Sequence, residues 1–390
     1  MEKIRLGIIG VGNMGFSHAK KVQEGKCPDM ELTAIADINS ERLEWVKENL
    51  DAGVVCFDDA MKMLDSGLID ACIVAVPHYE HTKYAIECMK KGIHTMVEKP
   101  AGVYTKQVRA MNEEADKHKD VIFGMMFNQR TNGVYRKLRE FVKSGKYGEI
   151  RRTNWIVTDW YRPQCYYDSG NWRATWSGEG GGVLLNQCPH NLDLMQWICG
   201  MPKKIDARIY YGKWHDIEVE DDVSAFLEYS NGATGVFVTS TGDAHGTNRF
   251  EIQMDKAKFI VENGKLMMEE YEITEQEFSK TSNNSFDTVP STVTEVKIEG
   301  ENPQHVGVLN AWANAILRSG ELVADGREGI NGLTLSNAMH LSSFLNKTIE
   351  IPFDEDLYYT ELMQRVSNSV HKKEVKAVYS DTSNSYNGNK

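Results

Sequence analysis

A turn of three glycines near the start of the chain constrains the fold more than any other feature of the sequence. A short apolar run, residues 6–9, ends in Gly10-Val-Gly12-Asn-Met-Gly15, and a helical pattern begins directly after it. A strand that enters a helix through such a turn leaves backbone N–H groups unpaired at the positive end of the helix dipole, where a pyrophosphate binds well. Gly10 would permit the tight turn, Gly12 the close approach of a phosphate, and Gly15 the contact between helix and strand. The turn residues expected to contact the ligand are Gly10, Gly12, Asn13, Met14 and Gly15.

An acidic residue downstream makes the dinucleotide interpretation more specific. Asp37 ends a second apolar run, residues 32–36, at the distance from the glycine turn where a carboxylate would hydrogen-bond the hydroxyls of an adenosine ribose. A carboxylate in that place would repel a 2′-phosphate, so the sequence favours NAD over NADP. A glycine turn without a ligand is the alternative.

The size and charge of the chain limit the classes of protein to which it can belong. A length of 390 residues exceeds one ordinary hydrophobic core and predicts two domains. The formal net charge is −12 and no cluster of Lys and Arg stands out, which argues against nucleic acids and anionic membranes as partners. No apolar run is long enough to cross a bilayer, and the chain enters a strand soon after Glu2 without the pattern of a signal peptide. The seven cysteines form no CxxC pair and no zinc-type cluster, so we expect reduced thiols, no metal and a cytoplasmic location.

The first 127 residues alternate apolar runs with helical patterns. Such alternation predicts a parallel sheet covered by helices on both faces, with ligands at the carboxyl ends of the strands. The expected strands are 6–9, 32–36, 71–76, 93–97 and 121–127, and the expected helices lie near 40–50, 58–66, 79–91 and 104–118.

From about Glu149 onwards, strand-like alternation replaces this rhythm and predicts a second domain built on a mostly antiparallel sheet. Asn231-Gly232 and Asn263-Gly264 each stand between two such runs and are strong hairpin signals. The expected strands are 153–158, 207–211, 223–229, 234–239 and 250–254, followed by helices near 305–319 and 327–346. The expected domains are 1–127, 128–352 and a C-terminal extension at 353–390, whose last residues, 381–390, we expect to be mobile.

Two motifs follow predicted strands of the first domain. Ala75-Val76-Pro77-His78 follows one strand, with His81 at the start of the next helix, and Glu98-Lys99-Pro100 follows the next strand. A lysine flanked by a glutamate and stiffened by a proline is poorly placed for a solvated surface charge. Its ammonium could hydrogen-bond a substrate hydroxyl oxygen and favour alkoxide character as hydride leaves. A structural Glu–Lys pair is the alternative.

A third motif reads Gly180-Gly-Gly-Val-Leu-Leu-Asn186-Gln-Cys-Pro189-His190-Asn-Leu-Asp193. On a helix, Asn186, His190 and Asp193 would share one face. Pro189 is tolerated only near the first turn, which predicts that His190 lies at the start of the helix, on its exposed rim. A neutral imidazole in that place can take a hydroxyl proton, whereas a structural histidine is the alternative.

Together, the glycine turn, the Glu98-Lys99-Pro100 motif and the glycine run with His190-x-x-Asp193 resemble the glucose–fructose oxidoreductase, inositol dehydrogenase and MocA family over residues 1 to about 350. The resemblance implies an α/β protein, with an N-terminal Rossmann domain on a parallel sheet and a C-terminal α+β domain on a large open, mostly antiparallel sheet. It further implies a nicotinamide cofactor, oxidation or reduction of a sugar or polyol carbon, and a homo-oligomer formed through the large sheet.

The same resemblance implies roles for single residues. Lys99 and His190 would carry the proton chemistry. Many members have an aspartate where this chain has Asn186, and an amide can orient an imidazole or bond a substrate but supplies no charge. We therefore expect His190 to be a weaker base and Lys99 to take a larger share, with Asp193 as a candidate substitute partner. The implied contacts at the nicotinamide end of the cofactor are Ala75, Pro77, His81, Glu98 and Lys99.

An aromatic-rich stretch between residues 155 and 176 predicts the substrate side of the site. Rigid aromatic faces with interleaved polar groups suit the C–H faces and hydroxyls of a sugar ring; core packing is the alternative, and it is favoured for Trp155, which lies inside an alternating strand. Asn128 and Arg130 directly follow the last predicted strand of the first domain; they are expected to contact the substrate or to form a structural polar hinge. His305, which opens a later helix, is a further candidate. The predicted substrate-binding residues are Lys99, Asn128, Arg130, Tyr167, Trp172, Arg173, Asn186 and His190.

The sequence thus favours an NAD-dependent dehydrogenase that oxidises a secondary hydroxyl of a sugar, glycoside or cyclic polyol to a ketone, for example at C3 of a glucosyl ring or on an inositol. Two alternatives stay open. In NAD-assisted glycoside cleavage by oxidation and elimination, Tyr167 or His305 would supply an additional base. A non-catalytic dinucleotide sensor could keep the glycine turn, although the presence of both Lys99 and His190 counts against it.

Overall fold

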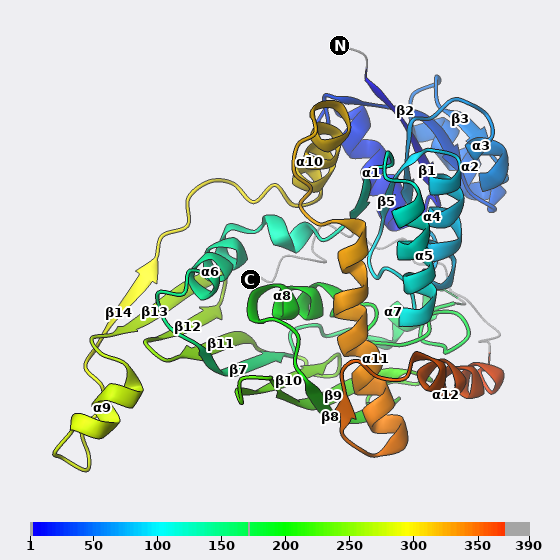
Figure 1. The fold of residues 1–390 in the computed structure, drawn as a ribbon. Coiled ribbons are helices and arrows are strands. Elements are labelled where there is room, and N and C mark those ends of the chain that lie inside the picture. The colour runs from blue at the N-terminus through cyan, green and yellow to red at the C-terminus, as the bar shows by residue number, and fades with distance from the viewer. Residues whose placement is uncertain (1–2, 171, 371–390) are drawn as a thin grey trace.

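The computed structural model describes residues 3–170 and 172–370, which form two sheets with their covering helices (Figure 1). The N-terminal sheet has six strands in the order β3-β2-β1-β4-β5-β6, and every pair in it is parallel. This confirms the predicted parallel sheet. Its strands are β1 (Ile4–Ile9), β2 (Met30–Ala36), β3 (Val55–Phe57), β4 (Ala71–Val74), β5 (His94–Val97) and β6 (Phe123–Met125).

Helices cover both faces of this sheet, because neighbouring strand residues face two separate cores. In β1, Leu6 and Ile8 belong to one core and Ile9 belongs to the other. One face carries α3 (Ala60–Leu64), α4 (His81–Lys90) and α5 (Thr105–Lys117), and the opposite face carries α1 (Asn13–Gln23), α2 (Ser40–Asn49) and α10 (Gln304–Arg318).

Helix α10 returns to the N-terminal sheet after the chain has built the second sheet (Figure 1). The Trp312 side chain is fully buried among residues of β1 and β4, and its Nε1 donates a hydrogen bond to the Ile122 carbonyl at 3.2 Å. A domain boundary at residue 127 would assign this helix to the second domain, whereas its buried face packs on the first.

The second sheet has nine strands in the order β14-β13-β12-β11-β7-β10-β9-β8-β15. Among the strand pairs that the described residues form in this sheet, only β7 and β10 are parallel, which confirms the prediction of a mostly antiparallel sheet. Its strands are β7 (Ile150–Val157), β8 (Lys204–Tyr211), β9 (Glu220–Glu228), β10 (Thr234–Ser240), β11 (Asn248–Met254), β12 (Ala257–Glu262), β13 (Lys265–Tyr271), β14 (Ser291–Val296) and β15 (Ile349–Glu350).

Both predicted hairpin turns lie where the sequence places them. Asn231 and Gly232 stand in the loop between β9 and β10, and Asn263 and Gly264 join β12 to β13. Asn263 and Gly264 both have positive φ, 50° and 71°, which is the geometry that favours Asn-Gly in a two-residue hairpin.

Helices pack on one face of the large sheet, and among the described residues the other face carries one helix, α9 (Glu275–Thr281), near its far end (Figure 1). The covering helices are α6 (Gly133–Lys143), α8 (Pro189–Cys199) and α11 (Gly329–Leu345), with α12 (Glu355–Ser367) beside α11 and the short α7 (Gln164–Asp168) in the loop after β7. The strands also carry large exposed apolar side chains, namely Ile156, Tyr210 and Phe226. Residues 381–390, which the sequence predicts to be mobile, lie outside the described residues. Within the described ranges, no helix is both long and apolar enough to cross a membrane.

Candidate active site

The glycine turn has the geometry that a dinucleotide requires. Gly10 has φ 89°, and a Cβ at this position would lie 2.5 Å from the Ala75 carbonyl oxygen. A Cβ on Gly15 would lie 1.9 Å from the Gly10 carbonyl oxygen. At Gly12, in contrast, the nearest atom to an added Cβ is the Arg42 guanidinium at 3.9 Å, so this side of the turn is open.

Helix α1 begins without a side-chain cap. Gly12 is the N-cap, Asn13 and Met14 form the first turn, and this turn contains no acidic residue. Unpaired N–H groups at an eleven-residue helix, facing the open side of a glycine turn, fit a pyrophosphate.

Asp37 lies directly after β2 and beside the glycine turn. Its carboxylate accepts hydrogen bonds from the Val11 N–H at 2.7 Å and the Asn39 N–H at 2.9 Å. The Arg42 guanidinium lies 3.5 Å from the same carboxylate and is half-exposed. A carboxylate and a cation therefore stand together at the place predicted for the adenosine ribose.

His81 braces the backbone that follows β4 and β5. Its Nδ1 lies 2.6 Å from the Pro100 carbonyl oxygen and its Nε2 lies 2.7 Å from the Val76 carbonyl oxygen. Since both ring nitrogens are engaged by backbone and the residue is buried, the structure gives His81 a bracing contact in place of the ribose contact that the resemblance implied. Ala75 and Pro77 remain at the carboxyl end of β4, beside Gly10.

Glu98 forms a buried pair that the sequence did not reveal. Its Oε1 lies 2.6 Å from the His18 Nε2 on α1, and its Oε2 accepts the Lys99 N–H at 3.1 Å. Burial opposes ionisation of Glu98, but the bond and charge of His18 outweigh it and lower the pKa to about 2. The pair ties the glycine-turn helix to the strand end that carries Lys99.

Lys99 links the two halves of the molecule. Its Nζ donates a hydrogen bond to the Asn186 backbone carbonyl at 3.0 Å, across 87 residues of sequence. Burial lowers the pKa of Lys99, while the negative charge of Glu98 raises it. A lysine with a lowered pKa, held by one carbonyl, can exchange a proton with a ligand more readily than a solvated lysine.

His190 occupies the second position of α8, with Pro189 at the first helical position as predicted. Its side chain is only 3% exposed, so the expectation of an exposed rim is wrong, because nearly every residue of α8 is buried. Burial and the positive charge of Lys99 hold the pKa of His190 well below its usual range. A neutral imidazole therefore stands within electrostatic reach of the Lys99 ammonium.

Asn186 and Asp193 do not act with His190 as one helix face. Asn186 precedes the helix, which begins at Pro189. Asp193 receives two hydrogen bonds from the Arg130 guanidinium, at 2.8 and 2.7 Å, and one from Gln196 at 3.0 Å. Asp193 is thus not available as the substitute partner of the imidazole, because its carboxylate is already committed to a buried bidentate pair.

The Arg130–Asp193 pair bears on whether Asn128 and Arg130 contact the substrate or form a structural hinge. Arg130 also donates to Glu328 at 2.8 Å, and the Asn128 amide donates to Gln304. Both side chains are buried, so the structure places them in the polar hinge between the domains rather than on a substrate surface.

The aromatic stretch divides into core and rim. Trp155 is fully buried and stacked on Phe250 at 4.1 Å, as the alternating strand predicts. Tyr167 is also buried, with its hydroxyl donating to Thr241 at 2.7 Å, so it packs in the core and does not form the lid that its loop position suggested. Burial also raises the pKa of Tyr167, which makes it harder to ionise.

Trp172 and Arg173 remain partly exposed near the cofactor end. The Trp172 ring meets His78 edge-on at 5.6 Å, and the Arg173 guanidinium lies 4.6 Å from the Trp172 ring and 4.7 Å from the Tyr166 ring. These stacked flat groups present the kind of surface that binds a sugar ring.

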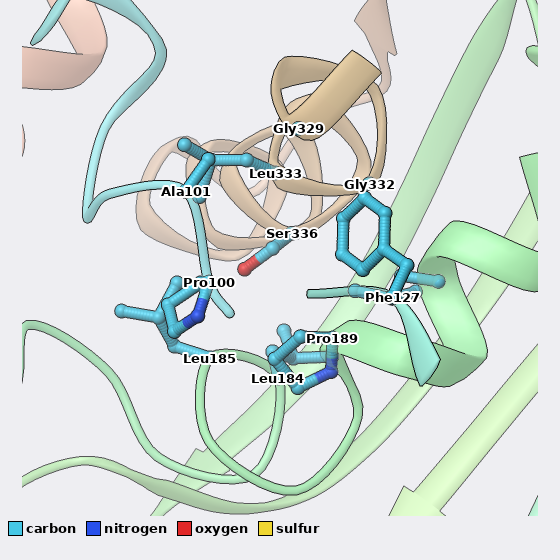
Figure 2. A pocket seen from close by; sticks show the side chains of 11 residues that line it. Pro100, Ala101, Phe127, Leu184, Leu185, Pro189, Gly329, Gly332, Leu333 and Ser336 are labelled. Carbon is cyan, nitrogen blue, oxygen red and sulfur yellow. The ribbon is translucent and has the colours of Figure 1, made fainter. Parts of the chain in front are cut away.

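A small apolar cavity lies behind Lys99 and His190. Its volume is about 10 Å³, room for about one water molecule, and Figure 2 shows Pro100, Phe127, Leu184, Leu185 and Pro189 closing around it. Ala101 and α11 complete the wall. The cavity is too small for a sugar; its lining forms the packed support that fixes Pro100 and Pro189, and with them the residues next in sequence. Across residues 3–170 and 172–370, no group of His, Cys, Asp and Glu has the arrangement of a metal site.

The sequence missed two buried residues of this region, His18 and Glu179. His18 could have been noticed because it follows Gly15 at helical spacing, but Glu179 gives no periodic signal, since it lies in a loop directly before the glycine run.

Comparisons with known proteins agree with this architecture in both halves. Residues 4–125 match the family described as oxidoreductase family, NAD-binding Rossmann fold, and residues 135–260 match the GFO/IDH/MocA C-terminal domain. The chain is 28% identical over 271 residues to the myo-inositol 2-dehydrogenase of Thermotoga maritima, covering 67% of this chain and 75% of that protein. It is 29% identical over 250 residues to the D-glucoside 3-dehydrogenase of Escherichia coli, covering 59% and 68%. The solved structure of the WlbA dehydrogenase from Bordetella pertussis, in complex with NADH and UDP-GlcNAcA, aligns with a TM-score of 0.75 at 26% identity over 90% of this chain and 100% of that one.

Proposed function

Because the chain belongs to the Gfo/Idh/MocA family of NAD(P)-dependent oxidoreductases, which act on CH–OH groups, we propose that it oxidises a secondary hydroxyl of a sugar, glycoside or cyclic polyol to a ketone. The observation that carries the proposal is the contact between Lys99 and the Asn186 carbonyl at 3.0 Å. It brings an amine from the end of the parallel sheet to the loop that leads into His190, at the sheet edge where a bound dinucleotide ends.

The bound nicotinamide would supply one function, acceptance of a hydride at its C4. His190, neutral because of its lowered pKa, would take the proton of the substrate hydroxyl. Lys99 would donate a hydrogen bond to the same oxygen and stabilise its developing negative charge. In the direction of reduction, the same two groups would return the proton.

We assign NAD as the preferred cofactor on the basis of Asp37. Its carboxylate, held by two backbone N–H groups, would accept hydrogen bonds from the ribose hydroxyls and repel a 2′-phosphate. Arg42 beside it would soften this repulsion, so the preference is one of degree.

The substrate class follows from the rim of the site and from the relatives. Trp172, Arg173 and Tyr166 form a stacked, partly exposed surface that suits the face of a pyranose or a cyclitol. Two relatives are named for myo-inositol and for a D-glucoside, and the aromatic rim favours a ring that carries a bulky aglycone.

A substrate panel tests the proposal directly. The purified protein is incubated with inositols, free hexoses and aryl glucosides, each with NAD and with NADP, and reduced cofactor is followed by its absorbance. Oxidation of one class with NAD and slower oxidation with NADP are expected. A shift of melting temperature with NAD, but no turnover on any compound, would instead support a dinucleotide sensor.

One arm of the panel contains an aryl glucoside without added cofactor. Release of free aglycone there would replace simple oxidation with glycoside cleavage on a retained NAD. Of the two bases considered for that reaction, Tyr167 is hydrogen-bonded to Thr241, which favours His305.

We also propose that the protein forms a homo-oligomer through the open face of the large sheet. This face carries Ile156, Tyr210 and Phe226, which alternate with buried strand residues and are each more than one-third exposed, and within the described residues its one helix is α9, near the far end. Size-exclusion chromatography with light scattering tests this; Phe226→Lys is expected to shift the protein towards monomer.

A further inference from the structure

Glu179 is a buried carboxylate at the centre of the loop that precedes α8. Its side chain lies directly before the glycine run and only 2% of the residue is exposed. One carboxylate oxygen accepts a hydrogen bond from the Asn186 side-chain amide, and the other accepts the Ala174 N–H at 2.6 Å. The Glu179 backbone oxygen also lies 3.3 Å from His78 Nδ1.

The contact with Asn186 determines which way that amide faces. An ionised carboxylate only accepts hydrogen bonds, so it selects the NH₂ end of the carboxamide and turns the carbonyl end away. A neutral Gln or a protonated acid in place of Glu179 would both donate and accept, and would leave the amide free to flip. The direction of Asn186 Oδ1 therefore depends on a charge at residue 179.

The same carboxylate acts on Lys99. Lys99 donates to the backbone carbonyl of Asn186, and the negative charges of Glu98 and Glu179 raise the pKa of Lys99 against the effect of burial. Burial also raises the pKa of Glu179, while the Arg173 guanidinium lowers it. Glu179 thus interacts electrostatically with two cations, Lys99 from the end of the parallel sheet and Arg173 from the aromatic rim.

We propose that Glu179 is a positioning residue of the active site: its ionised carboxylate fixes the carboxamide of Asn186 and supplies, from seven residues upstream, the negative charge beside Lys99 that Asn186 cannot supply. The inference rests on the proposed oxidation of a CH–OH group. It assigns Glu179 and Asn186 as one functional unit, a carboxylate and an amide that share a hydrogen bond.

A reciprocal exchange tests the unit. Glu179→Gln keeps the size of the side chain and removes the charge, and the double variant Glu179→Gln/Asn186→Asp returns one carboxylate and one amide to the pair in swapped positions. We expect Glu179→Gln to lower kcat by about 10- to 100-fold on the best substrate of the panel, with a smaller change in KM. The double variant is expected to recover at least about tenfold of that loss, since a charge-assisted bond is restored.

A second readout does not depend on turnover. The reactivity of Lys99 towards trace acetic anhydride, measured across pH by peptide mass spectrometry, reports the pKa of this amine. Glu179→Gln should move the Lys99 titration down by about one pH unit, and the double variant should move it back. The other titratable groups that interact with Lys99 are unchanged in both variants; they include Glu98, Tyr166, Arg173 and the imidazoles of His78, His81, His190 and His305.

Glu218→Gln is the matched control. Glu218 also accepts a backbone N–H of this loop, from Trp176 at 3.1 Å, but it is not among the groups that act most strongly on the pKa of Lys99. It should leave the Lys99 titration unchanged.

Wild-type kcat and Lys99 titration in Glu179→Gln would overturn the inference, as would a loss that the double variant fails to recover at an unchanged melting temperature. If the wild-type protein oxidises no compound of the panel, the proposed function fails, and the Lys99 titration still decides whether Glu179 controls this amine.

Discussion

The glycine turn at residues 10–15, the proposed cofactor wall, and the loop at residues 174–190, the proposed substrate wall, are held in different ways. The turn is fixed by backbone: a Cβ on Gly15 would lie 1.9 Å from a carbonyl oxygen five residues away. The loop is fixed by side chains from remote segments, with Lys99 bonded across 87 residues to Asn186. The comparison shows that the cofactor wall is specified locally, whereas the substrate wall depends on a buried polar network.

The largest expected effect is that of a substitution in the cofactor wall. Gly15→Ala places a methyl group against the Gly10 carbonyl oxygen, which can move only by opening the turn. We expect the affinity for NADH to fall by more than about 100-fold, equivalent to about 2.8 kcal/mol, or the domain to unfold. Fluorescence titration with NADH and thermal melting measure the two outcomes.

Gly53→Ala is the control for this variant, because an added Cβ there meets nothing within 4 Å. It should bind NADH like the wild type. Normal NADH binding by Gly15→Ala would show that the close approach of helix and strand does not build the cofactor site.

The second prediction tests the buried polar network beside the substrate wall, through the pair of Arg130 and Asp193. Arg130→Met leaves the buried Asp193 carboxylate without its bidentate partner and is expected to cost about 3–5 kcal/mol of unfolding free energy. Arg318→Met, which breaks the more exposed pair with Asp29, should change the melting temperature little. Chemical denaturation compares the two, and equal losses would remove the special role of the hinge pair.

A smaller effect is expected at Asp37, whose carboxylate accepts a hydrogen bond from Val11 in the cofactor wall. Asp37→Ser removes the carboxylate that repels a 2′-phosphate and leaves Arg42 to attract it. The ratio of NADPH to NADH affinity should rise by about tenfold, or about 1.4 kcal/mol. Asp51→Ser, on the surface of the same domain, should leave the ratio unchanged.

The smallest effect concerns the pH dependence of the reaction. Burial and Lys99 lower the pKa of His190, so kcat/KM should fall only when the pH drops below the ordinary range of a histidine, as the imidazole becomes protonated. Lys99→Met removes a nearby positive charge and should raise the pKa of His190. As the pH is lowered, kcat/KM of this variant should therefore begin to fall at a higher pH than in the wild type. If kcat/KM falls at the same low pH in both proteins, the charge of Lys99 does not affect the protonation of His190.

These differences explain how much of the molecule could be predicted. The parallel sheet, the switch to antiparallel strands and the helix beginning at Pro189 were all legible, because each depends on local periodicity or on one turn. Strand β3 was missed because it has three residues, and β14 because nearly all of its side chains are exposed and show no alternation.

The site was legible only in part, for the same physical reason. Gly10, Lys99 and His190 stand in motifs whose chemistry is visible in sequence. The burial of His190, the pairing of Asp193 with Arg130 and the contact of Glu179 with His78 arise between distant segments, which no local pattern encodes.

The central claim is that the Lys99 amine, from the end of β5, and the His190 imidazole, from the start of α8, act together on one substrate hydroxyl. A double-mutant cycle on kcat, using Lys99→Met, His190→Asn and the double variant, tests it most directly, with NADH binding and melting temperature measured for all three. Each single change should lower kcat by about 10²- to 10⁴-fold, and the double variant should be no more than a few-fold slower than the slower single variant, because residues that act as a unit are not additive. A double variant whose loss equals the product of the two single losses, with NADH still bound, would contradict the account.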